Sequence, residues 1–167
     1  LDDGAHNLTA TATDTAGNTG AASAALTVTI DTGDPIAPTA LDLDAGSDTG
    51  ITTDDITSAT TPTISGTAEA GSTVKLTSDI AGIVVATTTA DGGGAWTVAT
   101  DELDDGAHNL TATATDTAGN EGVDSTPLTV TIDTTAPTVT VDLLTTGDST
   151  PSLSGTIDDA AATVLIT

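Results

Sequence analysis

The sequence predicts an all-β protein built from tandem repeats, and three observations point to it. Apolar residues recur at every second position in short segments, as in residues 7–14, where Leu8, Ala10 and Ala12 share one face. Clusters of turn-forming residues, above all Gly and Asp, separate these segments. Long stretches of sequence recur along the chain, which is typical of repeat architectures. No segment shows a convincing helical period.

The repeats divide the chain into three parts. One stretch recurs without a single change, and two others recur with substitutions. The third copy lacks part of the loop that opens the repeat, because its final match comes at a shorter offset. The matching pairs are residues 1–18 with 103–120, 25–35 with 127–137, and 61–77 with 150–167.

These matches predict the domain boundaries. Residues 1–34 are the C-terminal part of a first repeat, residues 35–134 are a complete repeat, and residues 135–167 are the N-terminal part of a third. The simplest explanation is a fragment of a longer tandem array. The alternative is a natural subunit whose half-domains are completed by neighbours in a fibre.

The complete repeat is expected to contain about seven strands, which indicates an immunoglobulin-like β-sandwich. Residues 39–44 open the repeat. In residues 62–68 the inward side is Ile64, Gly66 and Ala68, and in residues 73–78 it is Val74 and Leu76, which sends Lys75 to solvent. The expected strands are residues 39–44, 62–68, 73–78, 83–90, 95–100, 109–116 and 128–133.

The remaining strands follow from the same alternation. Residues 83–90 and 95–100 are interpreted as a hairpin that turns at residues 92–94, with Trp96 and Val98 on the inner face. Residues 109–116 repeat the pattern of residues 7–14. The last strand, residues 128–133, repeats the earlier segment in which Leu26, Val28 and Ile30 face inward.

The charge is extreme, with 25 acidic residues against one basic residue and a net charge of −24. Such a chain repels itself and cannot neutralise phosphates, so nucleic acid is not an expected partner. Disorder is the alternative that this acidity raises, but the apolar residues are ordered in period two rather than scattered. The chain has no Cys, hence no disulfide, and no stretch expected to insert into a membrane.

Three motifs carry a resemblance to a known family. The stretches "TPTISGTAEAGSTVKL", "DGAHNLTATATDTAGN" and "LTVTIDTTAP" resemble bacterial Ig-like repeats of giant adhesins exported by type I secretion, including biofilm-associated and RTX-type adhesins. The resemblance covers nearly the whole chain. It implies an extracellular or cell-surface location, neighbouring Ig-like repeats of the same chain as partners, and Ca²⁺ at the linkers between repeats.

Acidic residues are expected to gather where one repeat meets the next. The last strand of an Ig-like repeat ends at the far pole, so residues 30–35 should meet the turn at residues 115–120 of the next repeat. Carboxylates that converge there repel one another unless a cation lies between them, and Ca²⁺ takes six to eight oxygen ligands in flexible geometry. The alternative is a short flexible hinge. The expected ligands are Asp31, Asp34 and Asp116, with Asn120 nearby, then Asp133 at the next junction, and Asp2, Asp3, Asp104 and Asp105 at the adjoining corners.

A second candidate Ca²⁺ site is the loop at residues 42–55, where Gly46 lets the chain turn back on itself. The alternative is a solvated acidic loop that limits aggregation. No cluster of His or Cys suggests zinc or a redox metal. The candidate ligands of the loop are Asp42, Asp44, Asp48, Asp54 and Asp55.

The other distinctive residues are expected to be structural. His6 and His108 stand at a corner before a strand, where the ring is expected to bind local backbone, as the Tyr does in the tyrosine corner of Ig folds. Trp96, the sole aromatic residue, is expected to fill the core; a sugar-binding Trp is the alternative. No nucleophile elbow, phosphate loop or metal-hydrolase motif is present, so the sequence predicts no enzyme.

Together these features predict a structural extender module of a giant bacterial cell-surface adhesin, rigidified by Ca²⁺ at acidic loops and linkers. One alternative is a module that itself binds a glycan or a protein. Another is a subunit of a self-assembling extracellular filament. Binding of ice or another regular surface by the Thr rows is disfavoured, because the twist of a sheet spoils a flat lattice match.

Overall fold

The computed structural model describes residues 1–80 and 82–166, and these residues form strands, turns and extended segments without a helix. None of them therefore belongs to a helix that is long and apolar enough to cross a membrane. The chain separates into two compact units, Leu1–Asp133 and Thr134–Thr167. Each unit is described by itself.

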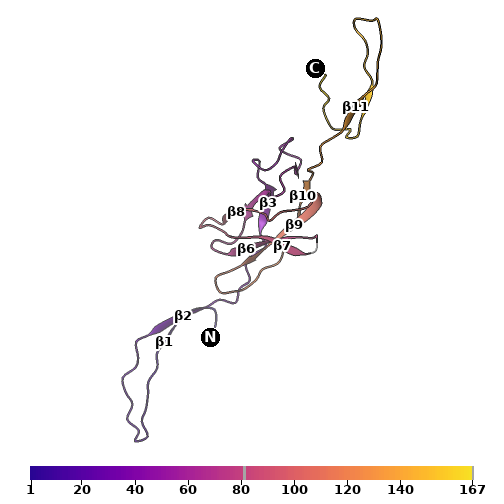
Figure 1. Ribbon diagram of the computed structural model, residues 1–167. Coiled ribbons are helices and arrows are strands. Elements are labelled where there is room, and N and C mark those ends of the chain that lie inside the picture. Colours follow the sequence, from indigo (N-terminus) through magenta and orange to yellow (C-terminus); the bar gives the residue numbers. More distant parts are fainter. Residues whose placement is uncertain (81, 167) are drawn as a thin grey trace. The chain divides into compact units, whose positions relative to one another are not determined.

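The first unit contains a complete two-sheet sandwich (Figure 1), so the expected all-β, immunoglobulin-like fold is confirmed. One sheet has three antiparallel strands and the other has five strands, with β9 at its centre. The three-stranded sheet has the order β3 (Thr39–Leu43), β5 (Thr63–Thr67) and β8 (Ala95–Ala99). The five-stranded sheet has the order β4 (Ile56–Thr57), β10 (Leu128–Ile132), β9 (Gly106–Thr115), β6 (Thr73–Ser78) and β7 (Ile83–Thr89).

All seven expected strands are present, and one strand was not expected. β4 is only two residues long and pairs in parallel with β10, with Thr57 opposite Ile132. Two residues are too few to show a period, so alternation cannot reveal such a strand. β4 anchors the end of the acidic loop beside the last strand of the repeat.

The expected hairpin at residues 83–100 is wrong. β7 pairs with β6, whereas β8 pairs with β5 in the opposite sheet, so the turn at residues 91–94 carries the chain from one sheet to the other. The turn itself is tight, since the amide of Asp91 donates to the carbonyl of Ala95 at 2.8 Å. Both strands point apolar residues at the same core from opposite sides, and alternation cannot distinguish that arrangement from a hairpin.

The core lies between the two sheets and follows the alternation of the sequence. Trp96 is 4% exposed, as expected, and its ring lies directly over Gly66. A Cβ atom at residue 66 would stand 2.5 Å from the indole, so the glycine makes room for the one aromatic side chain. The buried cluster contains Leu43, Ile64 and Trp96 from the three-stranded sheet, and Val74, Leu76, Val85, Leu110, Ala112, Val130 and Ile132 from the five-stranded sheet.

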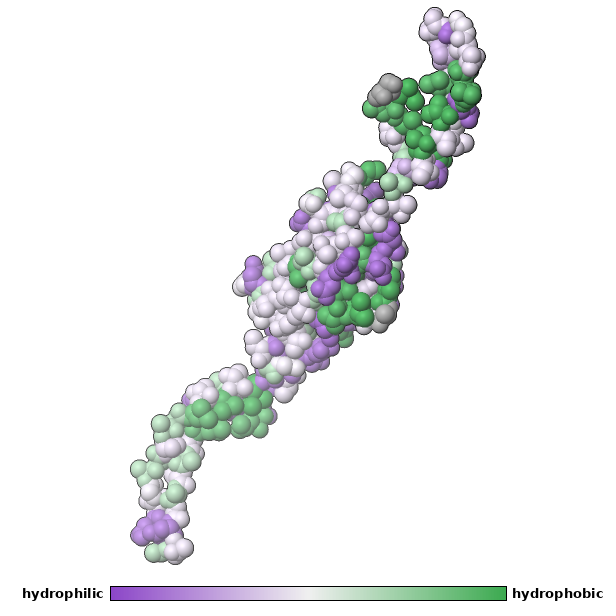
Figure 2. Space-filling model, viewed as in Figure 1, coloured by the Kyte–Doolittle hydropathy of each residue, from purple (hydrophilic) through white to green (hydrophobic). Residues whose placement is uncertain are grey.

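The N-terminal segment repeats the last two strands of the sandwich. β1 (Gly4–Leu8) and β2 (Leu26–Ile30) pair in the register of β9 and β10, with Leu8 opposite Leu26. Leu8 is nevertheless 42% exposed, whereas the equivalent Leu110 is fully buried. Figure 2 shows apolar side chains at the surface of this segment.

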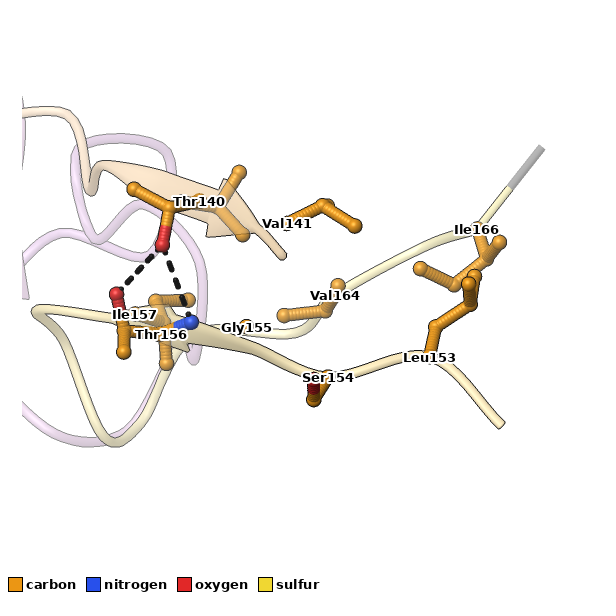
Figure 3. A pocket seen from close by; sticks show the side chains of 10 residues that line it. Thr140, Val141, Leu153, Ser154, Gly155, Thr156, Ile157, Val164 and Ile166 are labelled. Carbon is orange, nitrogen blue, oxygen red and sulfur yellow. Dashed lines mark hydrogen bonds between the residues drawn. The ribbon is translucent and has the colours of Figure 1, made fainter. Parts of the chain in front are cut away.

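The second unit contains one short antiparallel pair, β11 (Val139–Val141) and β12 (Gly155–Ile157). Its apolar side chains converge on a pocket that also receives Leu153, Val164 and Ile166 (Figure 3). In the sequence these three residues align with Ile64, Val74 and Leu76, which are core residues of the complete repeat. The second unit therefore carries counterparts of core residues from both sheets of the complete repeat.

Truncation of Trp96 should be the most damaging single change in the core. Because the indole is buried between the sheets, Trp96→Ala should lower the free energy of unfolding by roughly 3–5 kcal/mol. Urea denaturation monitored by circular dichroism measures the loss. Val123→Ala, at a side chain that is 74% exposed, is the matched control. Equal midpoints for the two variants would show that Trp96 does not hold the sandwich together.

Candidate functional site

The acidic loop, residues 42–55, is folded back against the sandwich rather than extended into solvent. The hydroxyl of Thr57 donates to the carbonyl of Ser47 at 2.5 Å, and the amide of Thr63 donates to the Ser47 hydroxyl at 3.0 Å. These two bonds place the next residue, Asp48, in the interior, where it is 5% exposed. Its Oδ1 atom is buried without a hydrogen-bond partner among residues 1–80 and 82–166. An unpaired buried carboxylate oxygen is costly unless something compensates it.

Burial and three carboxylates of the loop raise the pKa of a fourth, that of Asp55. Partial burial raises the pKa of Asp55, and the charges of Asp48, Asp42 and Asp54 raise it further, in that order. Asp55 also has a φ of 57°, a left-handed conformation that a residue with a side chain rarely adopts. Its carbonyl accepts the amide of Thr131 at 2.9 Å, which fixes it against β10. The fold thus concentrates negative charge without neutralising it.

Not every predicted ligand joins this concentration of charge. The Oδ1 of Asp44 accepts the amide of Gly46 at 2.9 Å and serves its own turn. Lys75, the single basic side chain of the chain, lies elsewhere and pairs with Glu121 at 3.7 Å. Within the described part of the chain, no group of three or more His, Cys, Asp or Glu residues stands ready to hold a metal ion. Metal binding by the acidic loop therefore stays a prediction.

A second set of predicted ligands lies at the end of the β9–β10 pair. Gly106 is opposite Ile132, so Asp105, just before β9, and Asp133, just after β10, flank the same end. The amide of Asp133 donates to the carbonyl of Thr57 at 2.9 Å, which ties this end to β4. Asp133 thus lies beside the strand that closes the acidic loop.

The carboxylate of Asp116 accepts hydrogen bonds from its own turn, which its place in the sequence did not predict. Its Oδ1 accepts the amides of Ala118, Gly119 and Asn120 at 2.8, 2.7 and 2.9 Å, and its Oδ2 accepts the Asn120 side-chain amide at 2.8 Å. These bonds, with that of the Asn120 side chain the strongest, lower the pKa of Asp116. A metal ion would have to compete with them, so the carboxylate first of all locks the turn.

The segment after β2 meets this turn, as expected, but not through two carboxylates. The Asn120 side chain donates to the backbone carbonyl of Asp31 at 3.1 Å, while the Asp31 carboxylate accepts the amide of Gly33 at 3.1 Å. Gly122 presses on the carbonyl of Pro35, where an added Cβ would lie 2.2 Å from the oxygen. Asp34, the other ligand predicted for this junction, is exposed.

Gly122 was missed, although the sequence contains a signal for it. The two copies are identical up to Asn18 and Asn120 and then diverge, yet a glycine is kept at residues 20 and 122 between neighbours that differ. A glycine retained in diverged surroundings indicates a close approach of another backbone.

His108 has the expected structural role. Its Nε2 lies 2.9 Å from the carbonyl of Asp104, and its Nδ1 lies 3.1 Å from the hydroxyl of Ser78. A carbonyl can only accept, so Nε2 carries the proton and Nδ1 accepts from the hydroxyl when the ring is neutral. His6 makes the equivalent bond to the carbonyl of Asp2 at 2.6 Å. Both rings therefore stabilise the corner before a strand by a hydrogen bond to local backbone.

Comparisons with known proteins agree with the architecture. A family model described as a bacterial Ig-like domain matches residues 1–32 and 35–134. The chain is also similar to a crystal structure of a tetra-tandem repeat in the extending region of a large adhesion protein, at 27% sequence identity and a TM-score of 0.45 over 94% of this chain and 45% of that chain. The chain thus spans less than half the length of that structure. No curated protein matches the chain.

Titration of individual aspartates should separate the turn from the loop. Asp116 should titrate below the ordinary value of 3.8, and Asp55 should titrate above it. Because its folded-state pKa is depressed, Asp116 stabilises the fold above its unfolded pKa and loses that contribution as the pH falls through the folded pKa. Asp55 works in the opposite sense, since its charge opposes folding until it is protonated. The side-chain carboxyl ¹³C shift as a function of pH measures both.

The two copies of the turn supply the control for this titration. Asn120→Ala removes the main cause of the lowered pKa, so Asp116 should return toward 3.8 while Asp14 in the first copy stays low. If Asp116 keeps its low pKa in this variant, the Asn120 side chain is not what stabilises the carboxylate.

Proposed function

The chain belongs to the bacterial Ig-like domain family, and we propose that it is a structural extender module of a giant bacterial cell-surface adhesin, stiffened by Ca²⁺. Two consecutive stretches match the same family model, which supports a tandem arrangement. The proposed partners are neighbouring repeats of the same chain. The proposed location is extracellular, at the bacterial surface, and the proposed role is not enzymatic.

The observation that carries the Ca²⁺ proposal is the buried carboxylate of Asp48. A carboxylate oxygen that is withdrawn from water and has no donor among the described residues is stabilised by a cation beside it. The charges of Asp48, Asp42 and Asp54 all act on Asp55, and the one basic side chain is paired elsewhere. Ca²⁺ prefers such oxygen ligands and tolerates irregular geometry, so modest rotation of these side chains would serve it.

The proposal includes a second ion where one repeat follows another. Asp105 and Asp133 flank the end of the β9–β10 pair, next to Asp104 in the chain. At the other pole the same role is proposed for Asp31 and Asp34. Asp116 already accepts four hydrogen bonds from its own turn, so we place it last among the ligands.

A glycan-binding or protein-binding role is the second candidate, and burial of Trp96 counts against it. Stacking on a sugar needs an exposed aromatic face, and the only aromatic side chain is 4% exposed. A filament subunit is the third candidate. It would show contacts between chains that grow with concentration, which distinguishes it from an extender.

Calcium should raise the thermal stability of the whole chain. A site held at 100 times its dissociation constant adds about 2.7 kcal/mol to the free energy of unfolding. Melting is measured by circular dichroism in excess chelator, in Ca²⁺ and in Mg²⁺ at matched ionic strength. Equal midpoints in chelator and in Ca²⁺ would contradict the proposal. Equal stabilisation by Mg²⁺ would reduce the effect to screening of charge.

Two variants with the same change of charge locate the site. Asp48→Asn should abolish most of the Ca²⁺-dependent rise, whereas Asp124→Asn, at an exposed residue, should keep it. Small-angle scattering on the same samples tests the extender role, because a stiffened chain has a larger maximum dimension in Ca²⁺ than in chelator. An unchanged dimension would separate metal binding from stiffening and reject the latter.

A further inference from the structure

The turn at residues 116–122, the joint turn, has a counterpart at residues 14–20, the first-copy turn, which differs only in having Thr19 in place of Glu121. In the first-copy turn the Oδ1 of Asp14 accepts the amides of Ala16 and Asn18, and its Oδ2 accepts the Asn18 side-chain amide, each at 2.9 Å. The joint turn repeats these bonds within 0.1 Å. Both copies are therefore held in one shape by their own aspartate.

The segment that follows β2 lies against the joint turn. The side-chain amide of Asn120 has two hydrogens, and it reaches both the Asp116 carboxylate at 2.8 Å and the Asp31 carbonyl at 3.1 Å. Gly122 lies so close to Pro35 that an added Cβ would be 2.2 Å from the carbonyl oxygen and 3.4 Å from the ring Cγ. The occupant is thus the segment that follows β2, from Asp31 to Pro35.

The first-copy turn offers the same groups, and within residues 1–80 and 82–166 no segment lies against it as closely as Pro35 lies against Gly122. An added Cβ at Gly20 would meet only the carbonyl of Ala12, at an ordinary 3.7 Å, and Asn18 is exposed. The shape of this turn is already set, so a partner would find a preorganised surface rather than one that it must order.

We propose that the turn at residues 14–20 and 116–122 is a socket for the end of a preceding Ig-like repeat. The recognised element is an extended segment with an Asp after its last strand and a Pro four residues further on. Asp31 and Pro35 have this spacing, and Asp133 and Pro137 repeat it. The side chain of Asn18 or Asn120 donates to the carbonyl of the residue after the strand. The missing side chain of Gly20 or Gly122 leaves room for the backbone at the proline. The inference rests on the tandem arrangement of the proposed function and not on its calcium.

Alanine at the two equivalent glycines tests the socket in the whole chain, in excess chelator. Neither glycine has a positive φ, so alanine changes the contact surface and not the backbone. Gly122→Ala should release residues 32–36, with ¹⁵N order parameters falling from about 0.85 to below about 0.6. Gly20→Ala should leave them unchanged. The fluorescence of Trp96 reports that the sandwich stays folded in both variants.

A peptide with the sequence of residues 29–38 tests the first-copy turn directly. Added at millimolar concentration to the ¹⁵N-labelled chain, it should shift the amide signals of Asn18 and Gly20, and Gly20→Ala should remove the shifts. Unchanged order parameters in Gly122→Ala, or an equal fall in Gly20→Ala, would overturn the socket. Absence of peptide shifts would overturn its extension to the first-copy turn.

Discussion

Pairing of β9 with β6 is the interaction on which the rest of the sandwich depends. Leu110–Thr115 lie opposite Ser78–Thr73, and this contact keeps the strand extended for its full length and buries Leu110, Ala112 and Ala114. Among the described residues, the strand that the identical residues form in the first copy, β1, pairs only with β2 and ends at Leu8. The same letters thus form a long buried strand or a short exposed one. Tertiary burial, rather than local preference, decides the outcome.

The second constraint is the separation of charge from core. The strands are lined with Ala, Val, Leu and Thr, and one indole packs over one glycine. The acidic residues are thereby confined largely to loops and turns at the ends of the strands. Some of them are used locally, as Asp116 is in its turn. Others, such as Asp48 and Asp55, are left with charge that the protein itself does not balance.

Strand alternation predicted the fold well because burial across two sheets imposes a period of two on every strand. It also placed Trp96 in the core. The structural role of His108 was predicted from its position at a corner before a strand, where its ring contacts nearby backbone. Alternation failed for β4, which is too short to have a period, and for the connection between β7 and β8. The prediction of Asp116 as a metal ligand came from its place at the junction between repeats, and position alone cannot show how many amides a carboxylate already accepts.

The parallel pairing of β4 with β10 has a consequence under tension. The amides of Thr131 and Asp133 donate to the carbonyls of Asp55 and Thr57, each at 2.9 Å. Because the strands are parallel, a force that drew β4 backward and β10 forward would slide them along each other, and both bonds would bear the load together. An antiparallel terminal pair pulled apart from one end would open one bond at a time. The shortest strand of the sandwich, β4, would thus resist shear at the last strand of the repeat.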